Sequence, residues 1–509
     1  MDRFRRIFRS AVLVIGFFGL SKITGLIRGR LVAGRFGASD EFDAFTAANQ
    51  LPELFFVLIA GGALAAAFIP IYTDYLKSER LKEALQLTHS TMSLVIIVLG
   101  ILAGLGAIFA HPISAVLVPD FSPEKQQLTA ELMQIILLQT MIFGVSGVIS
   151  AFLNGNQHFA LPALASVALD IGYIIGLFLF VDRFGLGAHG LAWGTVLGAI
   201  MHVGIQIPAL IKHKFSYRPQ LNWSLNGTQE LIRMMGPRLL TLGTIQFADL
   251  FIVRLTSGLP DGSTSAYFYG YFVMQLPETL FGTAIALVVF PTLAEMWNAG
   301  ELEDMKSTAM RTLGIIWTLT IPSAAGVILL GQPAIVLLLE GGAFGPETTA
   351  IVYGILVFFS LRIVSEASLE ILARFLYAQH DTYRPMYAYF VWLTLQVGFA
   401  YLLVGSLGVR GLALASTIAF TVLSVILWGI SRWKLGPLGE GPALASAGRA
   451  IVGTAVMSGV ILLIGRYVDS TLIFLAIGGS VGVMVYIGVN ALMGGKEIQD
   501  AYALVRNRA

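Results

Sequence analysis

Three cationic side chains interrupt the first long apolar run of the chain, where a membrane-spanning helix is expected. Lys22, Arg28 and Arg30 fall within residues 10–34, and glycines beside them would let such a helix bend. An ionised side chain inside a bilayer is costly unless it faces water, an opposite charge or a ligand. Cations that converge on one cavity suit an anionic ligand, particularly a phosphate or a pyrophosphate. The three residues are therefore the first candidates for a binding site.

An alternative interpretation gives these cations a structural role. Arg28 and Arg30 could extend to the outer interface of the membrane, and Lys22 could pair with a carboxylate such as Asp43 or Glu53. We favour the binding interpretation for Arg28 and Lys22. For Arg30 we favour the interfacial interpretation, although the residue stays in the candidate set.

Acidic residues at similar depth form the second group of candidates. Asp43 opens the next apolar run, and the sequence leaves open whether it caps a helix N-terminus or gates a cavity. Glu53 directly follows Pro52, so a carboxylate placed by a proline kink is the favoured interpretation, with substrate binding as the alternative. Asp249 is the candidate ligand for a coupling ion, but a buried pair with Arg254 is favoured over that role.

Further charges late in the chain have a structural interpretation. Arg362 and Glu366 are four residues apart, which places them on one face of a helix, and we expect them to satisfy each other. Glu278 follows a proline as Glu53 does, and it receives the same structural interpretation.

The composition identifies the kind of protein that must position these charges. The 509 residues are 56% hydrophobic and only 12% charged, where soluble proteins have about 25% charged residues. Such a chain could not cover the surface of a soluble protein, and without cysteine it is not a disulfide scaffold. A net charge of +2 gives no general surface for nucleic acid. We therefore predict an all-α polytopic membrane protein.

Fourteen apolar runs are long enough to cross a bilayer, which takes roughly 20 residues. Lys and Arg gather in the loops on one side, which predicts that both termini are cytoplasmic. The first run is interrupted by charges and no cleavage site follows it, so we expect a retained helix instead of a signal peptide. The runs lie near 10–34, 44–73, 89–111, 129–153, 160–181, 188–211, 228–256, 264–291, 307–338, 348–376, 384–404, 409–432, 447–466 and 471–493.

Three motifs of the first half recur in the same order in the second half, at offsets of 221 to 225 residues. Gln50–Glu53 recurs as Gln275–Glu278, elements of Phe152–Pro162 recur in Phe375–Pro385, and Gly187–Ala192 recurs as Gly408–Ala413.

This repeat predicts two parallel six-helix lobes, residues 1–220 and 221–436. Residues 437–509 would hold two appended helices and a cytoplasmic tail. Such an architecture suits alternating access around a cavity between the lobes, and a duplicated scaffold without transport is the alternative.

The sequence lacks the motifs of common enzymes and of ATP-driven pumps. It contains no P-loop, no dinucleotide fingerprint, no Gly-x-Ser-x-Gly and no zinc-protease motif. Its seven histidines show no metal spacing. We therefore predict a transporter, not an enzyme, with no metal and no cofactor.

Several of these segments resemble the MurJ (MviN) family, the lipid II flippases of the multidrug/oligosaccharidyl-lipid/polysaccharide exporter superfamily. The resemblance covers essentially the whole chain and includes the fourteen-helix count. The segments that carry it are Ser21–Arg28, Arg35–Ala38, Asp43–Phe45, Leu51–Pro52, Ala67–Pro70, Phe152–Pro162 and Met274–Pro291.

The resemblance implies that the protein flips lipid II, a polyprenyl-pyrophosphate-linked peptidoglycan precursor, across the bacterial cytoplasmic membrane for cell wall synthesis and cell shape. In the family, cations of the first span and an acidic residue at the start of the second are required, and Arg28 and Asp43 match those positions. Lys22 stands where the family usually has arginine, so the charge is kept and the bidentate fork is lost. The last two helices would line a groove for the polyprenyl tail. We expect a monomer.

Three positions depart from the family pattern. Phe56 and Phe272 stand where further cavity arginines are expected, and Gly29 stands where an acidic residue is expected. These departures keep two alternatives open: a flippase for another lipid-linked oligosaccharide, or a cation-coupled exporter of small molecules. The cations of the first span favour a flippase, because an exporter of cationic compounds would place acids in its cavity.

Overall fold

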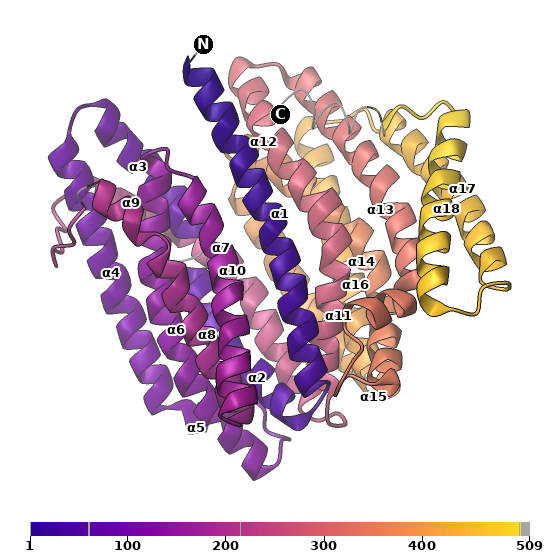
Figure 1. Cartoon of the computed structure of the whole chain (residues 1–509). Coiled ribbons are helices and arrows are strands. Elements are labelled where there is room, and N and C mark those ends of the chain that lie inside the picture. The colour runs from indigo at the N-terminus through magenta and orange to yellow at the C-terminus, as the bar shows by residue number, and fades with distance from the viewer. Residues whose placement is uncertain (1, 60–61, 214, 498, 500–509) are drawn as a thin grey trace. The chain divides into compact units, whose positions relative to one another are not determined.

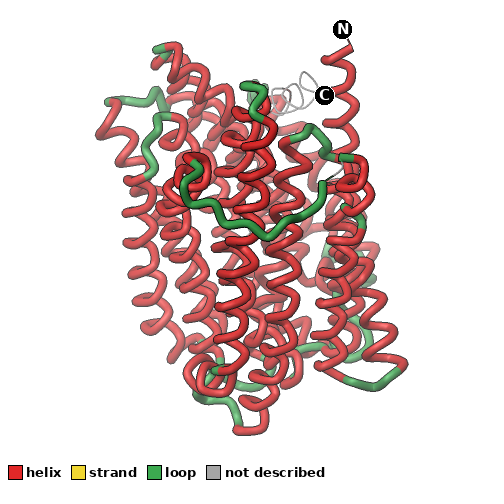
Figure 2. Tube along the Cα trace, turned by 90° about the vertical axis from the view of Figure 1, so that its left-hand side faces the viewer, coloured by secondary structure: helices red, strands yellow, loops and turns green. Residues whose placement is uncertain are grey.

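Long apolar helices make up the protein, as a bilayer requires of a chain that must satisfy its backbone polar groups internally. The computed structural model describes residues 2–59, 62–213, 215–497 and 499. Within these ranges the chain is helical, with short loops and no β-strand beyond one isolated bridge between Gly341 and Phe344 (Figure 2). The predicted all-α class is confirmed.

The chain divides into two compact units, Met1–Thr264 and Ser265–Ala509, whose helices are labelled in Figure 1. The first unit contains α1 (Asp2–Phe36), α2 (Asp40–Ile59), α3 (Gly62–Lys77), α4 (Leu81–Ile108), α5 (Ala110–Leu117), α6 (Pro123–Gly155), α7 (Ala160–Gly176), the π-helix η1 (Leu177–Arg183), α8 (Gly187–Gly204), α9 (Ile207–Lys212) and α10 (Asn226–Thr256). The helix α11 (Ser263–Glu278) begins at the boundary. The second unit continues with η2 (Thr279–Thr283), α12 (Ala284–Ala299), α13 (Leu302–Leu338), α14 (Pro346–Ala378), α15 (Tyr383–Leu407), α16 (Val409–Leu435), α17 (Gly441–Ile464) and α18 (Thr471–Leu492).

Twelve helical segments of the described residues are long and apolar enough to cross a membrane, and they coincide with the third to fourteenth predicted spans. The protein is therefore a multi-span membrane protein. The first two predicted spans correspond to α1 and to α2 with α3. The total of fourteen and the lobe boundaries at 220 and 436 remain predictions.

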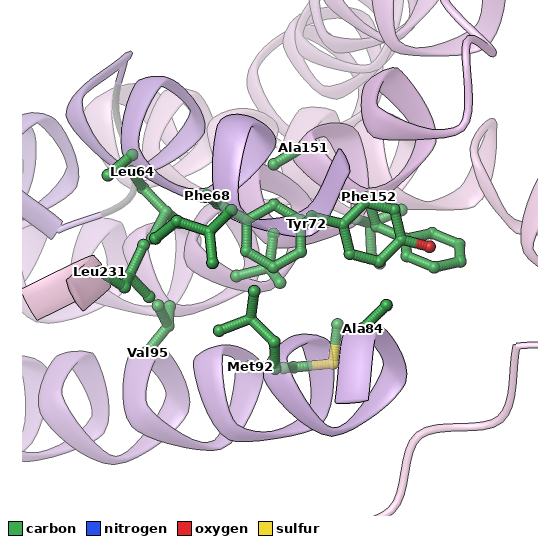
Figure 3. Packing of buried hydrophobic residues seen from close by; sticks show 14 of the residues in the cluster. Leu64, Phe68, Tyr72, Ala84, Met92, Val95, Ala151, Phe152 and Leu231 are labelled. Atoms are coloured by element: carbon green, nitrogen blue, oxygen red, sulfur yellow. The ribbon is translucent and has the colours of Figure 1, made fainter. Parts of the chain in front are cut away.

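The core of the first unit joins α3, α4, α6 and α10. Figure 3 shows Phe68 and Tyr72 of α3 at its centre, with ring centroids 5.2 Å apart. Tyr72 meets Phe152 of α6 edge-on at 5.5 Å, and Leu231 brings α10 into the same cluster. Burial of these large side chains fixes α10 in the first unit.

The appended helices α17 and α18 have a smaller core of their own with α13. Met457 and Ile461 of α17 pack with Tyr486 of α18 against Leu329 and Leu330 of α13. The Tyr486 hydroxyl also donates a hydrogen bond to the carbonyl of Thr318.

The Leu-Pro-Glu proline lies inside a helix in both units. Pro52 lies inside α2, and Pro277 lies inside α11, which passes into η2 at Thr279. A proline removes a backbone donor and crowds the preceding turn, so a helix tends to deform close to it. In the second unit the motif therefore coincides with a change to π-helix.

Candidate functional site

Arg28 of α1 is held by α7 and remains partly exposed. Its Nη1 lies 3.0 Å from Oδ1 of Asp170, and its guanidinium lies 5.0 Å from the ring centroid of Tyr173. The hydroxyl of Thr24, one turn earlier on α1, donates to Oδ2 of Asp170 at 2.7 Å. The Asp170 side chain is 6% exposed, but that of Arg28 is 33% exposed. Because a guanidinium has five N–H donors, part of this group stays available to a ligand.

Asp170, which holds Arg28 in place, has no role that could be assigned from the sequence. It lies 142 positions from Arg28, on another helix, so no local spacing joins the two. The available signal was an acid inside the fifth apolar run, which needs a partner at bilayer depth.

Lys22 and Arg30 both have exposed side chains on α1. The helix runs without interruption from Asp2 to Phe36, so the unwinding that its glycines would allow does not occur. At about 100° per residue, Lys22 and Arg30 lie about 120° and 160° around the α1 axis from Arg28, so the three accessible cations do not share one face. Their residue types still suit an anionic group.

Asp43 lies in the first turn of α2 and is 1% exposed. Its Oδ2 accepts hydrogen bonds from Nζ of Lys125 at 3.0 Å and from the backbone N–H of Gly262 at 2.7 Å. The residue therefore holds more than its own helix: it fastens α6 and the connection between α10 and α11. In the sequence, Lys125 is one of the basic residues between apolar runs, and no nearby residue predicts its contact with Asp43.

Lys125 bonds to two further carboxylates, at 2.6 Å from Asp40 and 3.0 Å from Asp261. The hydrogen bond from Lys125, together with one from Asp40, lowers the pKa of Asp261 below its ordinary value. Oxygens of the three carboxylates lie within 4.8 Å of one another, a spacing that a metal ion could use. Here the ammonium of Lys125 bonds to all three.

Glu53 and Asp249 are less buried than Asp43. Glu53 follows Pro52 in α2 with an exposed side chain, and Asp249 is half-buried in α10. Arg254 is exposed, and its guanidinium donates to the carbonyl of Val116. The prediction that Arg254 belongs to a buried pair with Asp249 is therefore wrong for the arginine, because its side chain extends to the α5 backbone.

In the second unit, the predicted pair of Arg362 and Glu366 is confirmed, with Nε to Oε2 at 2.8 Å. The guanidinium also donates to the hydroxyl of Ser416 at 2.7 Å and lies 4.0 Å from the ring centroid of Phe420. The Arg362 side chain is 7% exposed. This arginine is thus saturated by protein groups, unlike Arg28.

Two other carboxylates lie near this pair. Glu278 is 3% exposed and accepts a hydrogen bond from the hydroxyl of Thr283 at 3.1 Å. Glu370 pairs with Arg374 one turn later on α14.

The two phenylalanines at expected arginine positions are both half-buried. The ring of Phe56 packs against Phe143 of α6, with centroids 5.2 Å apart. An apolar contact therefore occupies this position in the first unit. Phe272 lies in α11.

Comparisons with known proteins complete the description. The family model described as "Lipid II flippase MurJ" matches residues 32–478. A probable lipid II flippase MurJ of Bdellovibrio bacteriovorus is 27% identical over 432 residues, which are 84% of this chain and 82% of that protein. The lipid II flippase MurJ of Burkholderia cenocepacia is 26% identical over 430 residues, 83% of each chain.

Solved structures share the fold. A lipid II flippase MurJ in an inward closed conformation superposes with a TM-score of 0.81 at 24% identity, covering 94% of this chain and 98% of that one. An inward-facing multidrug resistance transporter of the MATE family gives a TM-score of 0.69 at 16% identity, covering 85% of this chain and 99% of that one.

Proposed function

Since the chain belongs to the MurJ family, whose model matches residues 32–478, we propose that it flips lipid II from the inner to the outer leaflet of the bacterial cytoplasmic membrane. One observation carries the proposal to the residue level. The guanidinium of Arg28 is anchored by Asp170, whose carboxylate also accepts a hydrogen bond from Thr24, and the Arg28 side chain is 33% exposed. A guanidinium held in this way is preorganised for a pyrophosphate.

The anchoring decides how Arg28 acts. The ion pair with Asp170 uses Nη1, so the other N–H groups can donate to two phosphate oxygens at once. Lys22 and Arg30 add positive charge along the same helix. The bound pyrophosphate would thus exchange its hydration for charge-assisted hydrogen bonds from α1.

Asp43, in the first turn of α2, would support transport by holding α6 and the connection between α10 and α11 in position. Glu53, exposed on α2, would meet the polar part of the headgroup, and Asp249 would be the ligand for a coupling ion. Transport would be driven by that ion or by the membrane potential, without a cofactor or a resident metal.

The architecture that we propose has fourteen spans, formed by α1, α2 with α3, and the twelve segments described above. Two six-helix lobes would alternate access to a cavity, and α17 and α18 would accommodate the polyprenyl tail. Both termini would be cytoplasmic, and the protein would act as a monomer on a glycolipid substrate. The protein would be a transporter and not an enzyme.

A second candidate substrate follows from one contact. The packing of Phe56 on Phe143 places an apolar pair where the family pattern expects a cavity arginine. A headgroup with fewer anionic groups than lipid II would tolerate this change. A flippase for another lipid-linked oligosaccharide is therefore the alternative, ahead of a cation-coupled exporter of small molecules.

Complementation tests the proposal. The native lipid II flippase of a bacterial host is depleted, this chain is expressed, and externally accessible lipid II is measured in spheroplasts. We expect the parent to restore flipping, Arg28→Ala to lose it by about a hundredfold or more, and Arg28→Lys to retain part of it, because lysine keeps the charge and loses the fork.

The matched control is Arg80→Ala. Arg80 is an exposed arginine of the same unit that pairs with Glu83 at the surface, so its loss should leave flipping unchanged. Absence of rescue by a well-inserted parent would move the assignment to another lipid-linked glycan. Rescue by Arg28→Ala would remove Arg28 from the headgroup site.

A further inference from the structure

The Lys125 ammonium joins three segments that are distant along the chain. Lys125 is the third residue of α6, and its side chain is only 6% exposed. It bonds to Asp40 and Asp43 in the first turn of α2 and to Asp261 in the connection between α10 and α11. The ring of Phe121 covers it, with Nζ 4.1 Å from the ring centroid.

The backbone of the connection between α10 and α11 also takes part in this contact, through Gly262. Gly262 donates its N–H to Asp43 and has φ of +84°, a conformation that favours glycine. A Cβ at this position would lie 2.5 Å from the carbonyl oxygen of Ala38, in the turn between α1 and α2. The connection therefore lies directly against that turn and has no room for a larger residue.

The beginning of the connection is held by the segment between α5 and α6. The Ser257 hydroxyl lies 3.5 Å from Oδ2 of Asp120, and Gly258 lies against the same carboxylate. Residues 257–262 are thus bound at one end to the segment between α5 and α6, and at the other end to the first turns of α2 and α6. These residues lead directly into Ser265, where the second compact unit begins.

The contact needs the positive charge of Lys125, because three carboxylates meet there. Three carboxylates lie within 4.8 Å of one another, and Lys125 bonds to each of them. Without the ammonium, the carboxylates would repel one another at short range, and Asp43 would remain buried without its cation. The same groups that fasten the connection would then push it away.

The second unit has no lysine at the corresponding position. The helix α14 begins with Pro346-Glu347-Thr348, where α6 begins with Pro123-Glu124-Lys125. There the next residue, Thr349, donates its hydroxyl to Glu340 at 2.6 Å. The lysine-centred contact therefore belongs to the first unit and to the connection that leaves it.

We propose that Lys125 is a positioning residue that fastens the connection of residues 257–262 to α2 through Asp43 and Asp261, and that transport requires this contact. The second clause rests on the proposed function, and the first does not. The contact sets the position of Asp43, and it restrains the one connection through which the first unit is joined to the second along the chain.

Labelling of a single cysteine tests the contact. The chain contains no cysteine, so Ser263→Cys introduces the only thiol, at a residue that is 8% exposed and adjacent to Gly262. We expect Lys125→Met to raise the rate of maleimide labelling of the purified protein by about tenfold, because the connection opens more often. Lys125→Arg should restore most of the protection. Asp261→Asn, whose side chain is 75% exposed and does not threaten folding, should raise the rate about threefold.

The matched control is Lys306→Met in the second unit. Lys306 is as buried as Lys125, but its bond to Glu303 lies within one helix, so its loss should leave labelling at residue 263 unchanged. An unchanged rate in Lys125→Met, or an equal increase in Lys306→Met, would overturn the proposal. Because labelling needs no substrate, its result is independent of whether lipid II is the substrate.

Acid provides a second readout. The lowered pKa of Asp261 means that its stabilising contribution is present above its ordinary pKa and is lost as the pH falls through the lowered value. Hydrogen exchange of residues 257–262, corrected for the intrinsic rate, should therefore accelerate in acid in the parent. Lys125→Met should reverse that dependence, because acid would then neutralise carboxylates that repel one another without the cation: Asp40, Asp43, Asp261 and the nearby Asp120. Exchange that still accelerates in acid in Lys125→Met, as in the parent, would contradict the role of the lysine.

Transport tests the second clause. With the connection loosened in Lys125→Met, we expect flipping to fall at least fivefold while Lys306→Met flips normally. Faster labelling together with normal flipping would overturn the requirement for this contact in transport.

Discussion

The Leu-Pro-Glu motif occurs once in each unit, and its carboxylate has opposite surroundings in the two. Glu53 of α2 is exposed, whereas Glu278 of α11 is 3% exposed and bound by Thr283. Both copies place their proline inside a helix. The repeat has therefore kept the proline and changed the environment of the charge.

The neighbouring helices account for this difference. Glu366 and Glu370 of α14 lie close enough to Glu278 for their charges to interact. At the repeat offset of 223 residues, the equivalent positions of α6 are Phe143 and Gly147, and Phe143 packs on Phe56. The second unit thus uses its charges for internal pairing. The first leaves cations of α1 accessible, which is where we assign ligand binding.

The largest effect that separates the two units is expected from their arginines. Arg362→Ala should lower the free energy of unfolding by about 3–5 kcal/mol, because it leaves Glu366 buried without its cation. Arg28→Ala should cost less, about 1–2 kcal/mol: it leaves Asp170 without its cation, but Thr24 still donates to that carboxylate, and solvent already reaches one-third of the arginine side chain. Thermal unfolding in detergent measures both. Equal losses would show that Arg28 is as structural as Arg362.

A smaller effect is expected from the two motif carboxylates. At alkaline pH, where Glu278 is ionised, Glu278→Gln should raise the free energy of unfolding by about 1 kcal/mol, because a neutral amide removes the repulsion from Glu366 and Glu370 and still accepts from Thr283. Glu53→Gln should change stability by less than about 0.5 kcal/mol, since its side chain is exposed. A destabilising Glu278→Gln would show that the buried charge itself is needed.

Local patterns in the sequence were sufficient for part of this account. Apolar length predicted the helices, and a spacing of four residues predicted the pair of Arg362 and Glu366. Binding of Arg28 by Asp170 and of Asp43 by Lys125 could not be predicted in this way, because the partners lie 142 and 82 positions apart on separate helices. Such contacts depend on which helices pack together, which no spacing along one helix encodes.

The case of Arg254 illustrates the same limit. Its distance of five residues from Asp249 suggested a pair, yet its side chain reaches the carbonyl of Val116 on α5. The long side chain of Arg254 bonds to the acceptor that helix packing brings within reach, and this acceptor is a backbone carbonyl.

The central claim is that the accessible arginine of the first unit binds the pyrophosphate and the saturated arginine of the second does not. The most direct test is the dissociation constant for lipid II of the purified protein in nanodiscs, with the same substitution made in each unit. We expect Arg28→Lys to weaken binding by about tenfold, because the fork is lost, and Arg362→Lys to stay within about twofold of the parent. Unchanged binding by Arg28→Lys, or equal losses in the two variants, would contradict the account.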